Sequence, residues 1–112
     1  MSDKITSTEV MELLRKVGNG EIVPRLKNPI QTWEYVFCGE VTYILDRWEI
    51  EIFNDCGDFD YIHCVRSPDG RYGEFEDWFG PDHEWEQPDD KLYFADPECY
   101  QRMIQIFMEA AK

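Results

Sequence analysis

Hydrophobic residues near both ends of the chain repeat with the spacing of an amphipathic helix. Near the N-terminus one apolar stripe is formed by Val10, Leu13, Leu14 and Val17. Thr6 and Glu9 precede this stripe with the spacing of a capping box, and Gly18-Asn19-Gly20 predicts the end of the helix. A second stripe near the C-terminus is formed by Tyr100, Met103, Ile104 and Phe107. Asp96-Pro97 predicts its start, because Asp is a favoured N-cap and Pro fits the first helical position.

Between these helices the pattern changes to that of strands and turns. Residues 48–53 alternate most clearly, with Trp48, Ile50 and Ile52 on one face and Glu49 and Glu51 on the other. Further strands are predicted over 33–37, 41–45, 59–66 and 71–78, and a short edge strand over 92–94. The turn signals lie at 54–58 and 67–70, and the segments expected to be irregular are 21–31 and 80–90.

The turns between successive strands predict an antiparallel meander. We expect an α+β fold with an N-terminal helix, a four-stranded antiparallel meander and a C-terminal helix (α–β4–α). Both helices would cover one face of the sheet, and the other face would be acidic. The length of 112 residues predicts a single domain spanning residues 1–112.

The chain carries no sequence signal that points to a membrane or to export. No run approaches the roughly 20 apolar residues of a membrane span, and residues 1–4 lack the apolar core of a signal peptide. A cytoplasmic protein is therefore expected. In that compartment its cysteines, Cys38, Cys56, Cys64 and Cys99, would stay reduced, and none of them falls in a C-x-x-C pair.

Charge is distributed unevenly along the chain. Residues 1–33 carry five Lys or Arg and four Asp or Glu, whereas residues 34–98 carry 19 acids and four bases. Nearly all of the net charge of −13 therefore lies in the middle of the chain. This charge repels phosphates and anionic membranes, so direct nucleic-acid or membrane binding is not expected, and a basic protein is the natural partner.

Acidic and aromatic residues alternate in one stretch, which we expect to bind that partner. The candidate residues are Glu74, Glu76, Asp77, Trp78, Phe79, Glu84, Trp85, Glu86, Asp89 and Asp90. Their carboxylates would stand in for phosphates, while Trp78, Phe79 and Trp85 would anchor the interface. Two alternatives remain open: the acidity serves only solubility, and Trp78 and Trp85 belong to the hydrophobic core.

No residue pattern predicts catalysis or a cofactor. The many acids guarantee chance pairs, and no phosphate-cradling glycine loop is present. A zinc site from Cys56, His63, Cys64 and His83 has no recognised spacing, and on a regular strand His63 and Cys64 would point to opposite faces. We therefore expect a protein without catalytic residues, metal ligands or cofactor.

One turn offers an alternative function. Asn54, Asp55, Asp58 and Asp60 supply oxygen ligands of the kind that Ca²⁺ prefers, although their spacing departs from an EF-hand. The chain would then be a regulatory domain that responds to a divalent ion. An Asx turn with a purely structural role explains the same residues.

The segment Trp48-Glu49-Ile50-Glu51-Ile52-Phe53-Asn54-Asp55-Cys56-Gly57-Asp58-Phe59-Asp60-Tyr61 is followed by the turn Ser67-Pro68-Asp69-Gly70-Arg71. This pattern resembles a family of short, uncharacterised bacterial proteins with a W-x-[LI]-x-[LI]-F-N-D-C-x-x-x-D-Y core and an S-P-D-G-R turn. The resemblance spans roughly residues 8–108. It implies a strand, an Asx turn, a strand and a hairpin, and it implies no activity.

These observations lead to one functional expectation. The chain is expected to be a small acidic, non-enzymatic inhibitor that occludes a basic, nucleic-acid-handling protein. An immunity protein for a toxin and a phage-type inhibitor both fit this description. Repulsion between two chains of charge −13 favours a monomer when the protein is free.

Overall fold

A computed structural model describes residues 4–36, 38–78 and 87–112. Its elements in chain order are α1 (Ser7–Gly18), β1 (Arg25–Leu26), α2 (Trp33–Val36), β2 (Gly39–Leu45), β3 (Trp48–Asp55), β4 (Asp58–Arg66), β5 (Tyr72–Glu74), the 3₁₀ helix η1 (Phe75–Trp78), α3 (Pro88–Ala95) and α4 (Pro97–Ala110). The strands form one five-stranded sheet in the order β1-β2-β3-β4-β5, and every neighbouring pair is antiparallel. The predicted α+β class and the meander are confirmed, but the strand count of four is wrong.

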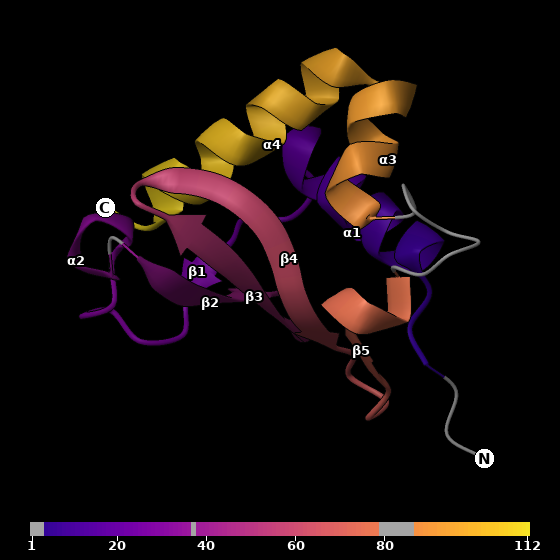
Figure 1. Cartoon of the computed structure of the whole chain (residues 1–112), viewed down its shortest axis with the longest axis horizontal. Coiled ribbons are helices and arrows are strands. Elements are labelled where there is room, and N and C mark those ends of the chain that lie inside the picture. Colours follow the sequence, from indigo (N-terminus) through magenta and orange to yellow (C-terminus); the bar gives the residue numbers. More distant parts are fainter. Residues whose placement is uncertain (1–3, 37, 79–86) are drawn as a thin grey trace.

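The fold has two layers, because α1, α3 and α4 all lie on one side of the sheet (Figure 1). Strand alternation sends one set of side chains toward these helices, including Val41, Tyr43, Ile50 and Ile52, all fully buried. Phe107 of α4 packs edge-on against the Tyr43 ring, with ring centroids 4.8 Å apart. The opposite set, which includes the Glu49 and Glu51 predicted to face water, lies on the outer face of the sheet.

Both predicted helix starts are present. The Thr6 hydroxyl accepts a hydrogen bond from the Glu9 backbone at 3.2 Å, and the Glu9 carboxylate accepts one from the Thr6 backbone at 3.3 Å. At the start of α4 the Asp96 carboxylate accepts a hydrogen bond from the Cys99 N–H at 3.1 Å. These caps fix where the two long helices begin and so how their apolar stripes meet the sheet.

β4 contains two β-bulges. Ile52 pairs with Ile62 and Glu51 pairs with Cys64, so His63 is an extra residue without a partner across the ladder. Asn54 pairs with Phe59 and Phe53 with Tyr61, so Asp60 is a second extra residue. With two more residues than the part of β3 it pairs with, β4 arches across the sheet (Figure 1).

The prediction for residues 21–37 is wrong in two places. The aromatic and β-branched run from Trp33 was expected to form a strand, but residues 33–36 form the short helix α2. Its first residue is held by tertiary contacts, since the Trp33 indole donates a hydrogen bond to the Gly57 carbonyl at 2.7 Å. Conversely, the segment expected to be irregular contains the edge strand β1, whose Arg25 and Leu26 pair with β2.

The C-terminal half of the sheet is shorter than predicted. Residues 71–78 were expected to be one strand, but the strand ends at Glu74 and continues as η1. Residues 92–94 were expected to be an edge strand, but they belong to α3, which begins at Pro88. None of the helices in the described parts of the chain is long and apolar enough to cross a membrane.

Candidate functional site

The outer face of the sheet carries a row of aromatic side chains. Phe53 of β3 stacks on Tyr61 of β4, with ring centroids 5.1 Å apart and planes at 10°. Tyr61 in turn contacts Phe75 of η1, with centroids 4.7 Å apart. All three rings are half-buried, so each keeps some surface on the side away from the helices.

Carboxylates surround this row on neighbouring strands. Glu40 pairs across the ladder with Phe53, and Glu74 and Glu76 line a cavity of about 210 Å³ together with Tyr61 and Phe75. Among the described residues, no Lys or Arg forms an ion pair with Glu40, Glu74 or Glu76. We call the set Glu40, Glu51, Phe53, Tyr61, Glu74, Phe75 and Glu76 the acidic aromatic surface.

The other end of the outer face is neutralised. Glu49 lies between two bases, with its carboxylate oxygens 2.7 Å from Lys27 Nζ and 2.8 Å from Arg66 Nη1. The hydrogen bonds from Lys27 and Arg66 hold the pKa of Glu49 below its ordinary value. The charge of Glu49 is therefore balanced within the protein. On this face the carboxylates that no described Lys or Arg balances include those of Glu40 and Glu74.

A second arrangement on the same face joins a thiol, an imidazole and two carboxylates. The Cys64 Sγ donates a hydrogen bond to Glu51 Oε2 at 2.7 Å. His63 Nδ1 lies 3.8 Å from Glu51 Oε1 and 3.9 Å from Glu40 Oε1. One ligand atom from each of Glu51, His63 and Cys64 lies within 4.8 Å of the other two. Sequence reasoning missed this cluster because the bulge at His63 turns both His63 and Cys64 to the outer face.

Cys64 is unusual in this cluster because it is only 2% exposed. Burial, and then the hydrogen bond to Glu51, raise the pKa of the Cys64 thiol to about 12. At neutral pH the thiol therefore keeps its proton, and nucleophilic chemistry, which needs a thiolate, has no support from this cysteine.

The structure divides the sequence-predicted binding residues into several environments. Glu74 and Glu76 belong to the acidic aromatic surface. The exposed Asp77 accepts a hydrogen bond from the Glu74 backbone at 3.0 Å and lies 3.6 Å from Lys4 Nζ. Trp78 is 3% exposed and donates a hydrogen bond to the Ile5 carbonyl at 3.0 Å, so its ring is part of the core and offers no surface for a partner.

The remaining predicted residues lie in or before α3. Phe79, Glu84, Trp85 and Glu86 fall outside the described residues, as does the histidine at position 83. Asp90 is half-buried, and burial raises its pKa. Asp89 is 4% exposed, so its carboxyl faces the protein interior rather than a partner.

Asp89 is the most strongly perturbed carboxyl in the described parts of the chain. Burial, and then the neighbouring charge of Asp90, raise the pKa of Asp89 to about 7. Its Oδ1 is buried without a hydrogen-bond partner among the described residues. A buried carboxyl that titrates near neutrality affects stability, as argued below.

The turn that was considered for calcium does not present its asparagine to an ion. Asn54 is fully buried, its Nδ2 donates to the Trp33 carbonyl at 2.8 Å, and its Oδ1 accepts from the Gly57 N–H at 2.7 Å. Both ends of the amide are therefore used inside the protein. The purely structural reading of this Asx turn explains Asn54 without an ion.

Two exposed cysteines lie beside the same turn. The Sγ atoms of Cys38 and Cys56 are 3.8 Å apart, and both thiols are free. The ligand atoms of Asp55, Cys38 and Cys56 lie within 4.8 Å of one another. All three side chains are exposed, so this cluster lacks the buried, fixed donor that Cys64 supplies on the outer face.

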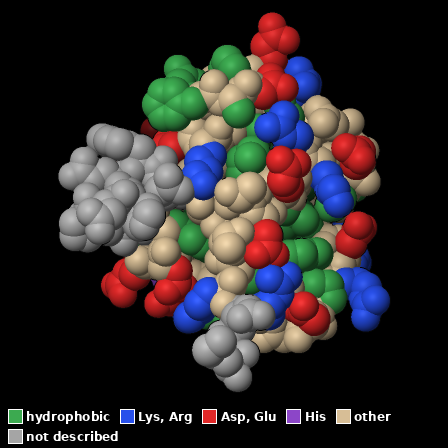
Figure 2. All heavy atoms as spheres, turned by 90° about the vertical axis from the view of Figure 1, so that its right-hand side faces the viewer, with side chains coloured by type: hydrophobic (Ala, Val, Ile, Leu, Met, Phe, Trp, Pro, Cys, Tyr) green, Lys and Arg blue, Asp and Glu red, His purple; other side chains and the backbone are tan. Residues whose placement is uncertain are grey.

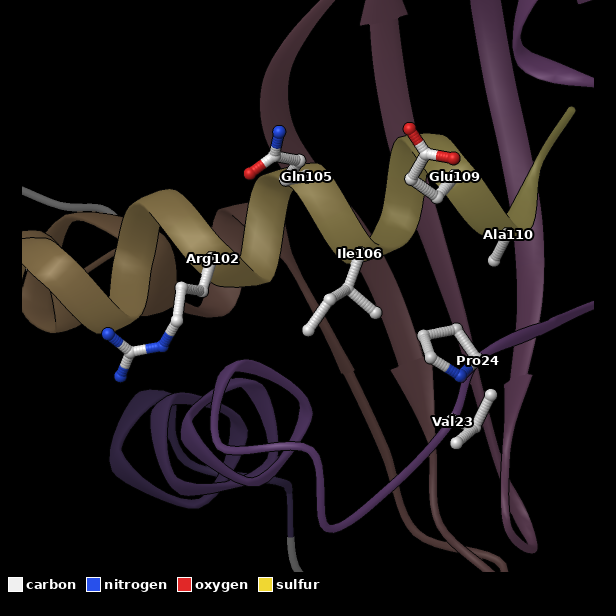
Figure 3. Close-up of a pocket in the computed structure, with 7 residues that line it drawn as sticks. All are labelled: Val23, Pro24, Arg102, Gln105, Ile106, Glu109 and Ala110. Carbon is white, nitrogen blue, oxygen red and sulfur yellow. The ribbon is translucent and has the colours of Figure 1, made fainter.

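Another cavity lies on the helical side of the molecule. A groove of about 480 Å³ separates α4 from Val23 and Pro24, and Ile106 and Ala110 point toward these two residues (Figure 3). Arg102 at one end of the groove donates a hydrogen bond to the Gly18 carbonyl at 3.2 Å. The groove walls are mostly hydrocarbon, and no set of polar groups converges in it that would support chemistry.

The surface over α1 and α3 has a different electrostatic character from the acidic aromatic surface. On that side Lys and Arg side chains are interspersed with Asp and Glu (Figure 2). On α1 itself, for example, Arg15 lies 3.6 Å from Glu12 and 3.9 Å from Asp96. The side over α1 and α3 therefore carries mixed charge rather than acidity alone.

Comparison with known proteins gives a family and no function. The model of a family described as a domain of unknown function, DUF7693, matches residues 4–88. No curated protein matches the chain, and no solved structure matches it. The matched segment begins just before α1, ends at the first residue of α3 and includes the entire sheet.

Proposed function

The chain belongs to the DUF7693 family, and we propose that it is a small non-enzymatic inhibitor that covers a basic site on a nucleic-acid-handling protein. One observation carries the proposal. Three aromatic rings lie in a row on the outer sheet face, and the carboxylates beside them have no Lys or Arg partner among the described residues. Carboxylates without cations beside exposed aromatic ring surface favour a cationic ligand.

The chemistry of such a surface suits lysine and arginine side chains. A guanidinium or ammonium group is attracted to the face of Tyr and Phe rings, and it forms charge-assisted hydrogen bonds with carboxylates. On this surface Tyr61 and Phe75 line the same cavity as Glu74 and Glu76, so ring faces and carboxylates are available to one side chain. The arrangement supports recognition of several basic residues along the row.

The net charge of −13 supports the same partner class at longer range. It accelerates encounter with a basic protein and repels nucleic acid. Because the chain and a nucleic acid are both anionic, the two would compete for the same basic site. Since the α1 and α3 side carries mixed charges (Figure 2), the field also orients the approach toward the outer sheet face. Occlusion of the basic site would be the mechanism of inhibition, and both a toxin and a host nucleic-acid enzyme fit this role.

The first test is capture of a partner from lysate of the host cells at about 50 mM salt, followed by its purification. The captured protein should be basic and should bind a labelled DNA or RNA oligonucleotide that the inhibitor displaces. Raising the salt to about 500 mM, where screening extends over only a few ångströms, should release the inhibitor. A partner that is not basic, or binding indifferent to salt, would contradict the proposal.

A charge-reversal pair then locates the interface. Glu74→Lys/Glu76→Lys should weaken partner binding by about tenfold or more, mainly through slower association. The matched control Glu12→Lys/Glu109→Lys makes the same change in net charge on the helices of the other layer and should have a much smaller effect. Equal losses in the two double variants would show that only net charge matters and would remove the acidic aromatic surface from the mechanism.

A further inference from the structure

We propose that Glu51, His63 and Cys64 form a binding site for Zn²⁺ or a similar thiophilic divalent ion, with Glu40 as the fourth ligand. The inference does not rest on the proposed inhibitory function. It rests on a carboxylate oxygen, an imidazole nitrogen and a thiol sulfur that lie within 4.8 Å of one another, and on Glu40 Oε1, which lies 3.9 Å from the imidazole nitrogen.

The distances from His63 to the two carboxylates fit shared ligation of an ion better than direct hydrogen bonding. Zinc bonds of about 2.0–2.3 Å in tetrahedral geometry place neighbouring ligand atoms roughly 3.3–3.8 Å apart. His63 Nδ1 lies 3.8 Å from Glu51 Oε1 and 3.9 Å from Glu40 Oε1. These separations are too long for a hydrogen bond, and His63 Nδ1 is a buried atom without a hydrogen-bond partner among the described residues. An ion between these atoms would satisfy the nitrogen.

The backbone fixes the ligands before an ion arrives. Glu51 and Cys64 are directly paired across the β3–β4 ladder, which holds their side chains side by side. The bulge adds His63 to the same face, next to Cys64 in sequence, although a regular strand would separate them. Glu40 reaches the site from β2, and its partner in the ladder is Phe53 rather than a base.

Cys64 supplies the feature that distinguishes this site from a chance group of surface acids. Its thiol is 2% exposed and already points at Glu51, with the S–H proton donated to Oε2 at 2.7 Å. On metal binding the S–H bond would break, the sulfur lone pair would bond to the ion and the proton would leave to solvent. The ion thus takes the position of the shared proton between Cys64 and Glu51.

The site has an open route to solvent and a defined neighbour. The side chains of His63 and Glu40 are 41% and 44% exposed, so an ion can enter from the outer face. His63 also lines the cavity formed with Tyr61, Phe75 and Glu74. Exchange of one thiol proton for a divalent ion adds one positive charge beside the acidic aromatic surface.

Cobalt(II) is the probe that tests this site most directly, because it occupies zinc sites and reports its ligands by absorption. The full chain with Cys38→Ser/Cys56→Ser should be used, since this background removes the exposed thiol pair. It should bind one Co²⁺ per chain, with a thiolate-to-cobalt charge-transfer band and the visible bands of tetrahedral coordination. Zn²⁺ should displace the cobalt and bleach both features.

Three variants in the same background decide the assignment. Cys64→Ser should abolish the charge-transfer band, whereas His63→Gln and Glu40→Gln should weaken binding by about tenfold or more. Circular dichroism and thermal melts of each variant without metal establish folding, and the partly exposed His63 and Glu40 keep the test meaningful if Cys64→Ser unfolds. Absence of the band, its persistence in Cys64→Ser, or unchanged affinity in His63→Gln would overturn the site.

Discussion

The side chain of Asn54 holds the backbone of Trp33, its Nδ2 donating to the Trp33 carbonyl at 2.8 Å. The same amide accepts a hydrogen bond from the Gly57 N–H, and the Trp33 indole donates to the Gly57 carbonyl. A closed set of three hydrogen bonds therefore joins the start of α2 to the β3–β4 turn.

Asn54→Ala should destabilise the fold by about 2–4 kcal/mol, because it leaves two buried backbone groups without partners. Urea denaturation monitored by tryptophan fluorescence measures the change. Asn28→Ala is the matched control, since the side chain of the exposed Asn28 accepts a local hydrogen bond, from the Ile30 N–H at 3.1 Å. Comparable losses in the two variants would show that burial of the amide is unimportant.

Tyr43→Phe tests the bond between the centre of the sheet and α4. The Tyr43 hydroxyl, fully buried, donates to the Phe107 carbonyl at 2.8 Å. Removing it should lower the free energy of unfolding by about 1–2 kcal/mol with the aromatic packing retained. A variant as stable as the parent would mean that the Phe107 carbonyl finds another donor.

The raised pKa of the buried Asp89 leads us to expect an unusual dependence of stability on pH. Its pKa rises from an ordinary 3.8 in the unfolded chain to about 7 in the folded protein. Between these values the folded state holds a proton that the unfolded state has lost, so this group's contribution to the free energy of unfolding falls as the pH rises from about 4 to 7. Above about pH 7 the loss from this group is complete.

Asp89→Asn should therefore stabilise the protein at pH 8, by about 1–4 kcal/mol, and have little effect near pH 4. Denaturation midpoints at several pH values measure this difference. Glu98→Gln, at an exposed acid in the first turn of α4, should show no such trend. Equal stability of Asp89→Asn and the parent at pH 8 would contradict the raised pKa.

Gly18→Ala should separate α1 from α4. A Cβ at Gly18 would lie 2.5 Å from Cys99 Sγ and 2.7 Å from the Cys99 carbonyl oxygen. We expect a net loss of about 1–3 kcal/mol, despite the higher helix propensity of alanine. Adding Cys99→Ala should restore little, because the backbone oxygen remains in place, and a thermal melt that rises in Gly18→Ala would refute the close approach.

Local signals predicted the elements whose ends are set by neighbouring residues. Thr6 and Glu9 cap α1 as expected, Asp96 caps α4, and the alternation of residues 48–53 gives β3 with Ile50 and Ile52 inside. At the two helix starts the side chains that carry the signal also satisfy backbone N–H groups, and in β3 the residues that carry it are those that are buried. Such elements need no knowledge of the rest of the fold.

The segments whose structure was predicted wrongly depend on contacts between residues that are distant in sequence. Trp33 has strand-forming neighbours, yet hydrogen bonds with Asn54 and Gly57 place it at the start of a helix. The predicted edge strand at 92–94 instead belongs to α3, whose N-cap Gln87 forms no side-chain capping bond. A helix start without a capping side chain leaves little signal in the sequence. The one signal present here is Pro88, at the first helical position of α3.

Only part of the candidate site could be predicted from the sequence. The acidic and aromatic character of residues 74–76 was visible, but its partners Phe53, Tyr61 and Glu40 come from other strands. The reasoning that set His63 and Cys64 on opposite faces assumed a regular strand, and the bulge makes that assumption wrong. Period-two patterns do not reveal where a strand gains a residue.

The two bulges of β4 also constrain how the length of this strand can change. Phe59, Ile62 and Val65 all face the helices, because each bulge takes up one extra residue, Asp60 or His63, without reversing the faces of the residues beyond it. Deleting Asp60 or His63 alone would therefore leave a regular ladder at that point, with inside and outside unchanged. Deleting a residue that is paired across the ladder has no such outlet, so viable deletions in β4 should fall at positions 60 and 63.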